Sequence, residues 1–276
     1  MHMNEASHTP ALVASSAPSD NPQPHGLGRL FLVPTPLDFG CETQAPIADV
    51  LPQETLRVAA RVSHWITENA KSTRAFLKRI DAVQPLQQAL QSLCITELPR
   101  EVHKKGDHTE GFDAKPLLQM ALAGHDVALV SEAGMPAVAD PGASVVRAAH
   151  ALGVQVVPLV GPVSLLLALA ASGLNGQNFA FVGYLPHNAS ERSQRLRALE
   201  SWVHQTGQTQ LFIETPYRNA ALWEAMVHAL QPHTRLARAS GLTLPTMQVQ
   251  CQSVQAWRKE KNSAVPNAPT VFAIGK

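Results

Sequence analysis

Short apolar runs alternate with amphipathic stretches along the chain, and the two patterns predict strands and helices respectively. Runs that predict strands fall at residues 29–35, 63–67, 94–98, 127–130, 154–160, 179–186, 209–215, 234–240, 246–252 and 268–275. Helical apolar spacing falls at residues 53–62, 68–80, 114–124, 143–152, 163–171, 189–205, 217–230 and 253–261. This alternation favours parallel βαβ units.

The pattern restarts after residues 173–177, and this restart divides the chain into two units. We expect an α/β fold class with two α/β/α domains and mainly parallel sheets, comprising residues 29–174 and 175–276. Residues 1–28 are rich in Ala, Ser, Pro, His and Asn, a composition typical of a disordered tail. A cleft between two such domains is a favoured place for a ligand.

The loop at residues 131–142, which follows a predicted strand, is long and apolar for a strand-to-helix connection. It lies at the carboxyl end of that strand, where open α/β sheets bind ligands. Gly134 and Gly142 permit close backbone approaches, and the prolines of the loop stiffen its path. The loop therefore offers backbone amides to a ligand, or it is an ordinary surface loop in which Asp140 caps the next helix and Pro141 enters its first turn.

Composition is typical of a globular protein with an aliphatic core, since 45% of the 276 residues are hydrophobic and 5% are aromatic. The 22 Lys and Arg residues balance 21 Asp and Glu residues, so net charge does not indicate nucleic acid, although a local basic patch is compatible with it. No apolar block fits a signal peptide or a membrane span, and the scattered Cys41, Cys94 and Cys251 indicate reduced thiols in a cytoplasmic protein. The 12 histidines lack zinc-helix spacing, so no metal site is expected.

Seven motifs in order carry a family resemblance: "LFLVPTP", "ENAKSTRAFL", "LVSEAGMPAVADPG", "VVPLVGPVS", "FVGYLP", "FIETPYR" and "APTVFAIG". Together they resemble the tetrapyrrole methylase superfamily, which comprises two-domain methyltransferases that use S-adenosylmethionine (SAM). Within it the chain is most similar to the branch that methylates a cytidine ribose 2′-hydroxyl in small-subunit ribosomal RNA. The resemblance extends from Arg29 to the end of the chain.

This resemblance implies that SAM lies in the cleft between the domains and is held largely by main-chain groups. The turn "VGPVS" would offer amides near the methionine moiety, although Gly161 and Pro162 also serve as the start of a helix. Gly134 would give the backbone room to approach. The cofactor contacts that the resemblance implies are Pro36, Ala133, Gly134, Met135, Val138, Pro162, Val163, Ser164, Tyr184, Leu242, Pro269 and Thr270.

Methyl transfer to a ribose hydroxyl benefits from a general base, and Glu68 at the end of a predicted strand is the first candidate. Its alternative role is that of an acid at a helix N-terminus. Lys71 and Arg74 would contact phosphate or are simply solvated, and Glu214 and Arg218 form a structural ion pair or contact substrate. A basic loop contains Arg100, His103, Lys104 and Lys105. This loop would bind a phosphate backbone or an acidic tetrapyrrole, or it is merely solvated.

Several positions depart from the RNA-methylating branch. The usual Gly-Asn-Leu and following Asp are replaced at residues 37–43, the usual Glu-Asp-Thr-Arg is altered at 68–71, and the usual Leu-Thr-Lys is altered at 242–244. In the 131–142 loop, Glu132 replaces Asp and Met135 replaces Thr. These changes indicate a divergent paralogue.

We therefore expect a SAM-dependent methyltransferase that acts on RNA and forms a homodimer, with no membrane association. One alternative is methylation of a tetrapyrrole or another small molecule. The absence of a Gly-x-Gly-Pro-Gly-Asp loop after the first strand argues against a tetrapyrrole substrate. Another alternative is a non-catalytic paralogue that binds SAM or RNA.

Overall fold

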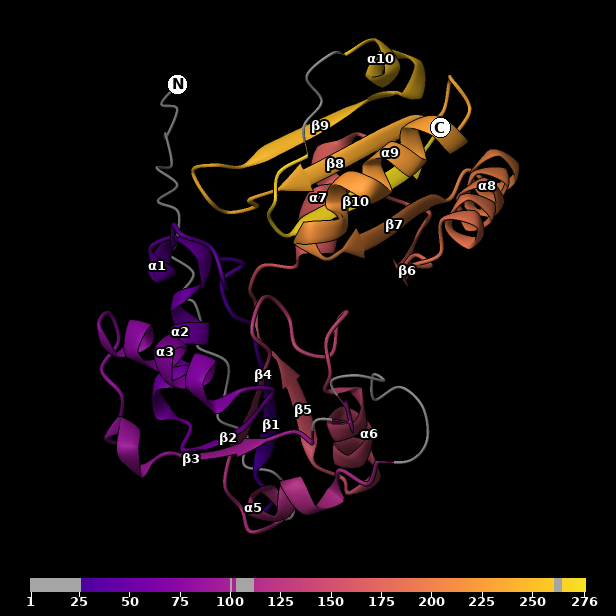
Figure 1. The fold of residues 1–276 in the computed structure, drawn as a ribbon. Helices are drawn as coiled ribbons and strands as arrows, with labels where there is room; N and C mark the ends of the chain where they lie inside the picture. The colour runs from indigo at the N-terminus through magenta and orange to yellow at the C-terminus, as the bar shows by residue number, and fades with distance from the viewer. Residues whose placement is uncertain (1–25, 100, 103–111, 261–264) are drawn as a thin grey trace, which may run out of the picture.

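Two lobes make up the computed structural model, which describes residues 26–99, 101–102, 112–260 and 265–276. Figure 1 shows the N-terminal lobe below and the C-terminal lobe above, joined through the segment that leads into α7 (Ser164–Ser172). Residues 1–25 of the predicted tail lie outside the described residues.

The N-terminal sheet is parallel throughout, as the alternation of strands and helices predicts. Its strands are β1 (Arg29–Val33), β2 (His64–Thr67), β3 (Cys94–Glu97), β4 (Val127–Val130) and β5 (Gln155–Pro158). Their spatial order is β3-β2-β4-β1-β5. Because β1 and β4 are neighbours, the loops that follow them meet at the carboxyl edge of the sheet.

Helices cover both faces of this sheet, because alternate strand residues point to opposite sides. Phe31 and Val33 face the core that α2 (Gln53–Arg61) and α3 (Ala70–Asp81) complete. Leu30 and Leu129 face the other core, which holds the 3₁₀ turn η2 (Lys115–Leu118), α5 (Gln119–Leu122) and α6 (Ala143–Ala151). The lobe therefore has three layers, α/β/α.

Local sequence explains most boundaries in this lobe. Asn69 accepts hydrogen bonds from the amides of Lys71 and Ser72 and so starts α3, one residue after Glu68. The helix predicted at 114–124 is split into η2 and α5, with a proline in the first turn of η2. Two short elements escaped prediction, α1 (Ile47–Val50) and η1 (Leu90–Ser92), because three or four residues show no apolar period.

The C-terminal sheet differs from the expected parallel arrangement. Its strands are β6 (Phe179–Tyr184), β7 (Thr209–Glu214), β8 (Arg235–Ser240), β9 (Gln248–Ser253) and β10 (Thr270–Gly275), in the order β6-β7-β10-β8-β9. Only β6 and β7 run parallel, whereas the other three pairs are antiparallel. The expectation of mainly parallel sheets thus fails for this lobe, because β8 reaches β9 through a short turn and β10 inserts between β7 and β8 in the opposite direction.

Different helices cover the two faces of the C-terminal sheet. On one face lie α8 (Ala189–Thr206), α9 (Asn219–Ala229) and α10 (Val254–Lys259), around a core that includes Trp223, Trp257 and Phe272. On the other face, α7 packs through Leu165 and Leu169 against β8 and β10. By packing, α7 belongs to the C-terminal lobe, so we propose a domain boundary before it, near residue 160, in place of 174/175.

Candidate active site

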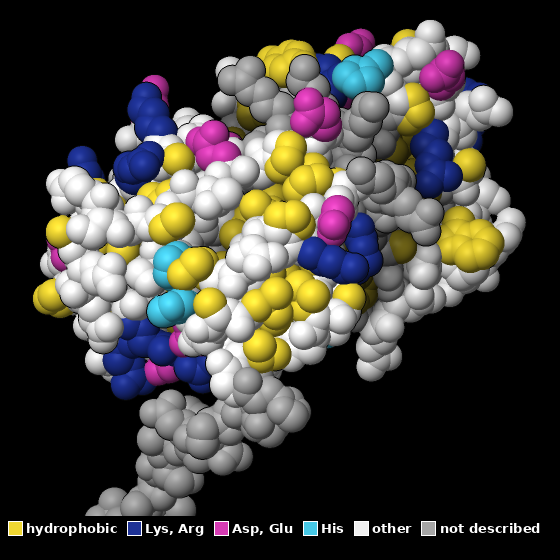
Figure 2. All heavy atoms as spheres, turned by 90° about the horizontal axis from the view of Figure 1, so that it is seen from below, with side chains coloured by type: hydrophobic (Ala, Val, Ile, Leu, Met, Phe, Trp, Pro, Cys, Tyr) yellow, Lys and Arg dark blue, Asp and Glu magenta, His cyan; other side chains and the backbone are white. Residues whose placement is uncertain are grey.

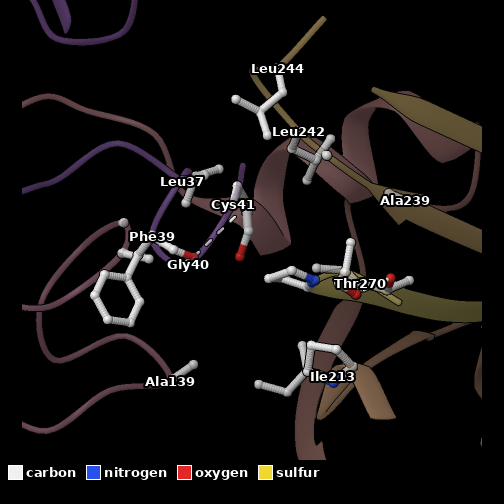
Figure 3. A pocket seen from close by; sticks show the side chains of 18 of the residues that line it. Leu37, Phe39, Gly40, Cys41, Ala139, Ile213, Ala239, Leu242, Leu244 and Thr270 are labelled. Atoms are coloured by element: carbon white, nitrogen blue, oxygen red, sulfur yellow. Dashed lines mark hydrogen bonds between the residues drawn. The ribbon is translucent and has the colours of Figure 1, made fainter. Parts of the chain in front are cut away.

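A cavity of about 610 Å³ lies between the lobes. The N-terminal lobe contributes the loop after β1 and the loop after β4, and the C-terminal lobe contributes the start of α7, the ends of β6 and β7, the β8–β9 turn and the start of β10. Figure 3 shows Leu37, Phe39 and Ala139 on one side of this space and Ile213, Leu242 and Thr270 on the other. Its volume is that of a typical small-molecule site.

The two N-terminal loops are tied together at Gly134. Thr35 donates its amide to the Gly134 carbonyl at 2.9 Å, and Gly134 donates its amide to the Thr35 carbonyl at 3.1 Å. Gly134 has a φ of +79°, and a Cβ there would meet Leu37 Cδ2 at 3.1 Å. Glycine is therefore required for the turn and the close packing, and its own amide is already used within the protein.

Backbone strain is concentrated beside the cavity in the same loop. Ala137 and Ala139 have φ values of +64° and +65°, a region that alanine rarely occupies. Between them Val138 is 42% exposed, and Asp140 follows as a lining residue. Strain of this kind persists where the surrounding structure enforces it, often at functional sites. The N-cap residue of α6 is Gly142, two residues after Asp140.

The N-terminus of α7 opens on the cavity. Val163, Ser164 and Leu165 line the space, and no side chain caps the helix. The first intrahelical hydrogen bond runs from the Leu167 amide to the Val163 carbonyl at 3.0 Å. The amides of the residues before Leu167 therefore lack intrahelical partners. Unbonded amides and the helix dipole favour a negative group at this place.

The C-terminal wall is an apolar slot with a fixed rim. Ala239, Leu242, Leu244 and Val271 line it, beside other apolar side chains. The rim is held by Asn219, whose side-chain amide donates to the carbonyls of residues 266 and 268 at 3.2 and 2.8 Å. Such a slot suits a flat, largely apolar ring system.

Asp140 lines the cavity and is close enough to two other carboxylates, Glu68 and Glu132, to be affected by their charge. Burial, together with the nearby charges of Glu68 and Glu132, raises the pKa of Asp140 to about 7. Burial also raises the pKa of Tyr184, and the charges of Asp140 and Glu214 act in the same direction. Asp140 is therefore poised to exchange a proton near neutral pH.

Figure 2 views the molecule from below and shows the side chains of the described residues by type. Lys and Arg side chains form separate groups there, most of them beside Asp or Glu side chains. Within the described ranges, no cluster of His, Cys, Asp and Glu could hold a metal ion, and no helix has the length and apolarity to span a bilayer.

Comparison with known proteins places the chain in a family. A family model described as tetrapyrrole (corrin/porphyrin) methylases matches residues 51–254. The chain belongs to the tetrapyrrole methylase family. A solved member of similar fold is the uroporphyrin-III-C-methyltransferase from Thermus thermophilus, with a TM-score of 0.50 and 17% identity over 90% of this chain and 94% of that one.

Curated relatives of this family member carry the name ribosomal RNA small subunit methyltransferase I. The protein from Vibrio cholerae is 32% identical over 80% of this chain and 67% of its own length. The protein from Pseudomonas aeruginosa is 34% identical over 69% of this chain and 58% of its own length. The protein from Escherichia coli O157:H7 is 30% identical over 82% of this chain and 68% of its own length.

The structure gathers most of the cofactor contacts predicted by resemblance around the cavity. Those that line it are Ala133, Gly134, Met135, Val138, Val163, Ser164, Tyr184, Leu242, Pro269 and Thr270. Pro36 instead lines an adjacent cavity of about 220 Å³. Pro162 lines a third cavity of about 670 Å³, and its carbonyl oxygen is 3.5 Å from the position of a Cβ on Gly134.

The predicted catalytic and substrate residues lie farther from the cavity. Glu68 is half-buried and does not line it, although its charge acts on Asp140. Lys71 and Arg74 are exposed on α3, and the Arg74 guanidinium donates to the Ala70 carbonyl at 3.4 Å. The remaining basic candidates, Arg100, His103, Lys104 and Lys105, lie outside the described residues.

Sequence reasoning missed the part that Asp140 plays in the cavity wall. The available signal is an acid on an apolar loop at the carboxyl end of a strand, although the same position also fits a helix cap. The ion pair between Glu214 and Arg218 is present, and the Arg218 Nε donates to Glu214 Oε1 at 2.9 Å.

Proposed function

We propose that the protein is a SAM-dependent methyltransferase that acts on a ribose 2′-hydroxyl of RNA. The observation that carries this proposal is the cavity between the lobes of a methylase family member. Around this cavity lie the uncapped N-terminus of α7, an apolar wall, and the Asp140 carboxyl group, whose pKa is about 7. The names of the curated relatives support RNA as the substrate class.

The residues around the cavity fit SAM. The amides at the start of α7, near Val163 and Ser164, would hold the carboxylate of the methionine moiety. The slot formed by Leu242, Leu244 and Val271 would hold the adenine ring. When bound there, SAM supplies an electrophilic methyl group to an oxygen nucleophile.

The chain itself would position the acceptor and take up its proton, since methyl transfer in line depends mainly on orientation and exclusion of water. We assign the general base to Asp140, because its carboxyl group lines the cavity and exchanges a proton near neutral pH. Glu68, the base predicted from sequence, would act instead through its charge, which favours the protonated form of Asp140.

The decisive experiment combines binding and transfer. Calorimetry should show SAM and its demethylated product binding to the full chain, and methyl-labelled SAM should label deproteinised small-subunit RNA but not uroporphyrinogen. Label in uroporphyrinogen alone would favour the tetrapyrrole alternative, and binding without label in either acceptor would favour a non-catalytic paralogue. The expected homodimer stays a prediction, which sedimentation velocity would test.

A further inference from the structure

The only two tyrosines of the chain both stand exposed at the rim of the cavity. Tyr184 ends β6 and is 56% exposed, and Tyr217 follows β7 in the turn η3 (Pro216–Arg218) and is 77% exposed. Tyr184 and Pro216 line the cavity itself. Because β6 and β7 are parallel neighbours, both rings project from the same edge of the C-terminal sheet.

The backbone directs Tyr184 to this rim. The pairing of β6 with β7 shifts register between Phe181 and Tyr184, and Gly183 between them has a φ of +73°. Irregularities of this kind bend a strand and redirect a side chain, and they occur often beside active sites. An exposed aromatic ring adds little to the core, so the folding of the lobe does not account for either tyrosine.

Cationic groups lie beside the two rings. The Arg218 guanidinium carbon is 5.6 Å from the centre of the Tyr217 ring, and its Nη1 lies 2.8 Å from His187 Nε2. Arg192, in the first turn of α8, donates to the His187 carbonyl at 3.1 Å. The Nε of Arg192 is buried and has no hydrogen-bond partner within the described part of the chain.

Each of the two arginines also has an acidic neighbour. Glu214 is buried and already paired with Arg218, and Glu191 is exposed in the first turn of α8. Asp140 faces Tyr184 from the other lobe. The rim therefore joins two exposed aromatic rings to arginine side chains, and proteins bind unpaired nucleotides by stacking their bases on aromatic rings and on guanidinium planes.

We propose that Tyr184 and Tyr217, with Arg218, His187 and Arg192, form a stacking platform for single-stranded RNA next to the acceptor nucleotide. This inference rests on the proposed function and extends it. A ribose in an unpaired strand can turn into the cavity more freely than one held in a duplex, and stacking of a flanking base would hold that strand at the rim. The platform thus selects unpaired RNA over duplex without reading its sequence.

The test uses the full chain and a fluorescein-labelled RNA 12-mer of mixed sequence that forms no hairpin. Tyr217→Ala should weaken binding by about tenfold or more, whereas Tyr217→Phe should bind as the wild type does, because stacking does not need the hydroxyl group. The matched control is Trp202→Ala, since Trp202 is 51% exposed on α8 but lies about three turns from Arg192. The same 12-mer annealed into a duplex should bind more weakly than the single strand.

The outcomes separate the platform from the proposed activity. Equal binding by wild type and Tyr217→Ala, an equal loss in Trp202→Ala, or wild-type preference for the duplex would each overturn the platform. Wild-type protein that binds the 12-mer through Tyr217 but transfers no labelled methyl group to small-subunit RNA would leave the platform standing and refute the proposed reaction. Methyl transfer with an unchanged KM in Tyr217→Ala would refute the platform alone.

Discussion

Replacing Asp140 with asparagine should abolish methyl transfer and at the same time stabilise the protein. The carboxyl group has a pKa of about 7 in the fold, against 3.8 for an ordinary aspartate. Ionising such a group at pH 8 costs up to about 4 kcal/mol of folding free energy. The native state binds more protons than the unfolded state between about pH 4 and pH 7, so stability falls as pH rises through this window.

The stability gain of Asp140→Asn is therefore pH-dependent. Above pH 7 it should reach about 1 to 4 kcal/mol, and it should disappear as the pH falls towards 4. Urea unfolding of wild type and variant at pH 8 and pH 4.5 measures it. A gain of equal size at both pH values would show that the asparagine acts through something other than the buried charge.

The pH dependence of methyl transfer should follow the ionisation of Asp140 as well. The wild-type kcat/KM should rise about tenfold between pH 6 and pH 8 and then level off, because about a tenth of Asp140 is ionised at the first pH and about nine tenths at the second. Asp140→Asn should lose about 10²- to 10⁴-fold in rate. Glu68→Gln should stay active and shift the profile towards acid, since it removes a neighbouring negative charge. An inactive Glu68→Gln beside an active Asp140→Asn would return the base to Glu68.

Three further changes test other parts of the account. Gly134→Ala should lower stability by about 1–3 kcal/mol and weaken SAM binding, and in urea unfolding it should cost more than Gly153→Ala, which has a similar φ of +70° but open space around it. Ser164→Asp should weaken SAM binding about tenfold or more in calorimetry, because a carboxylate at the start of α7 repels the carboxylate of the ligand. The melting temperature should not fall, since an acid is favourable at a helix N-terminus. Unchanged affinity would show that α7 does not bind the ligand. Arg79→Ala should cost about 3–5 kcal/mol in urea unfolding, since it strands the buried Asp38 that Arg79 contacts at 2.8 Å, and a loss below 1 kcal/mol would contradict that role.

The order of strands and helices could be read from the sequence because each element shows its own apolar period. The direction of strands in the C-terminal sheet could not, because it depends on which strands pair across long stretches of chain. The segment at residues 163–171 was correctly predicted as a helix, but its apolar residues do not say which sheet they cover. Its packing against β8 and β10 is determined by tertiary contacts, which the local sequence pattern does not specify.

The residues of the cavity wall could be predicted where glycine and proline motifs fix the backbone path, as in the loop around Gly134 and the turn before α7. The chemistry was harder to predict, because a pKa depends on burial and on charges brought together by the fold. Asp140 is adjacent in sequence to neither Glu68 nor Tyr184, yet its proton affinity depends on the first and affects that of the second. Tyr217 lies within the motif "FIETPYR", but its exposure at the rim could not be predicted, since an exposed loop residue shows no periodic pattern.

Methyl transfer from SAM to a ribose hydroxyl in this cavity would leave a 2′-O-methyl group on the RNA. The most direct measurement is alkaline hydrolysis of small-subunit RNA after reaction with methyl-labelled SAM, because a 2′-O-methyl group blocks cleavage of the adjacent phosphodiester. The label should appear in an alkali-resistant dinucleotide, and Asp140→Asn should abolish it. Label released as mononucleotides, or RNA that stays unlabelled while SAM binds, would contradict it.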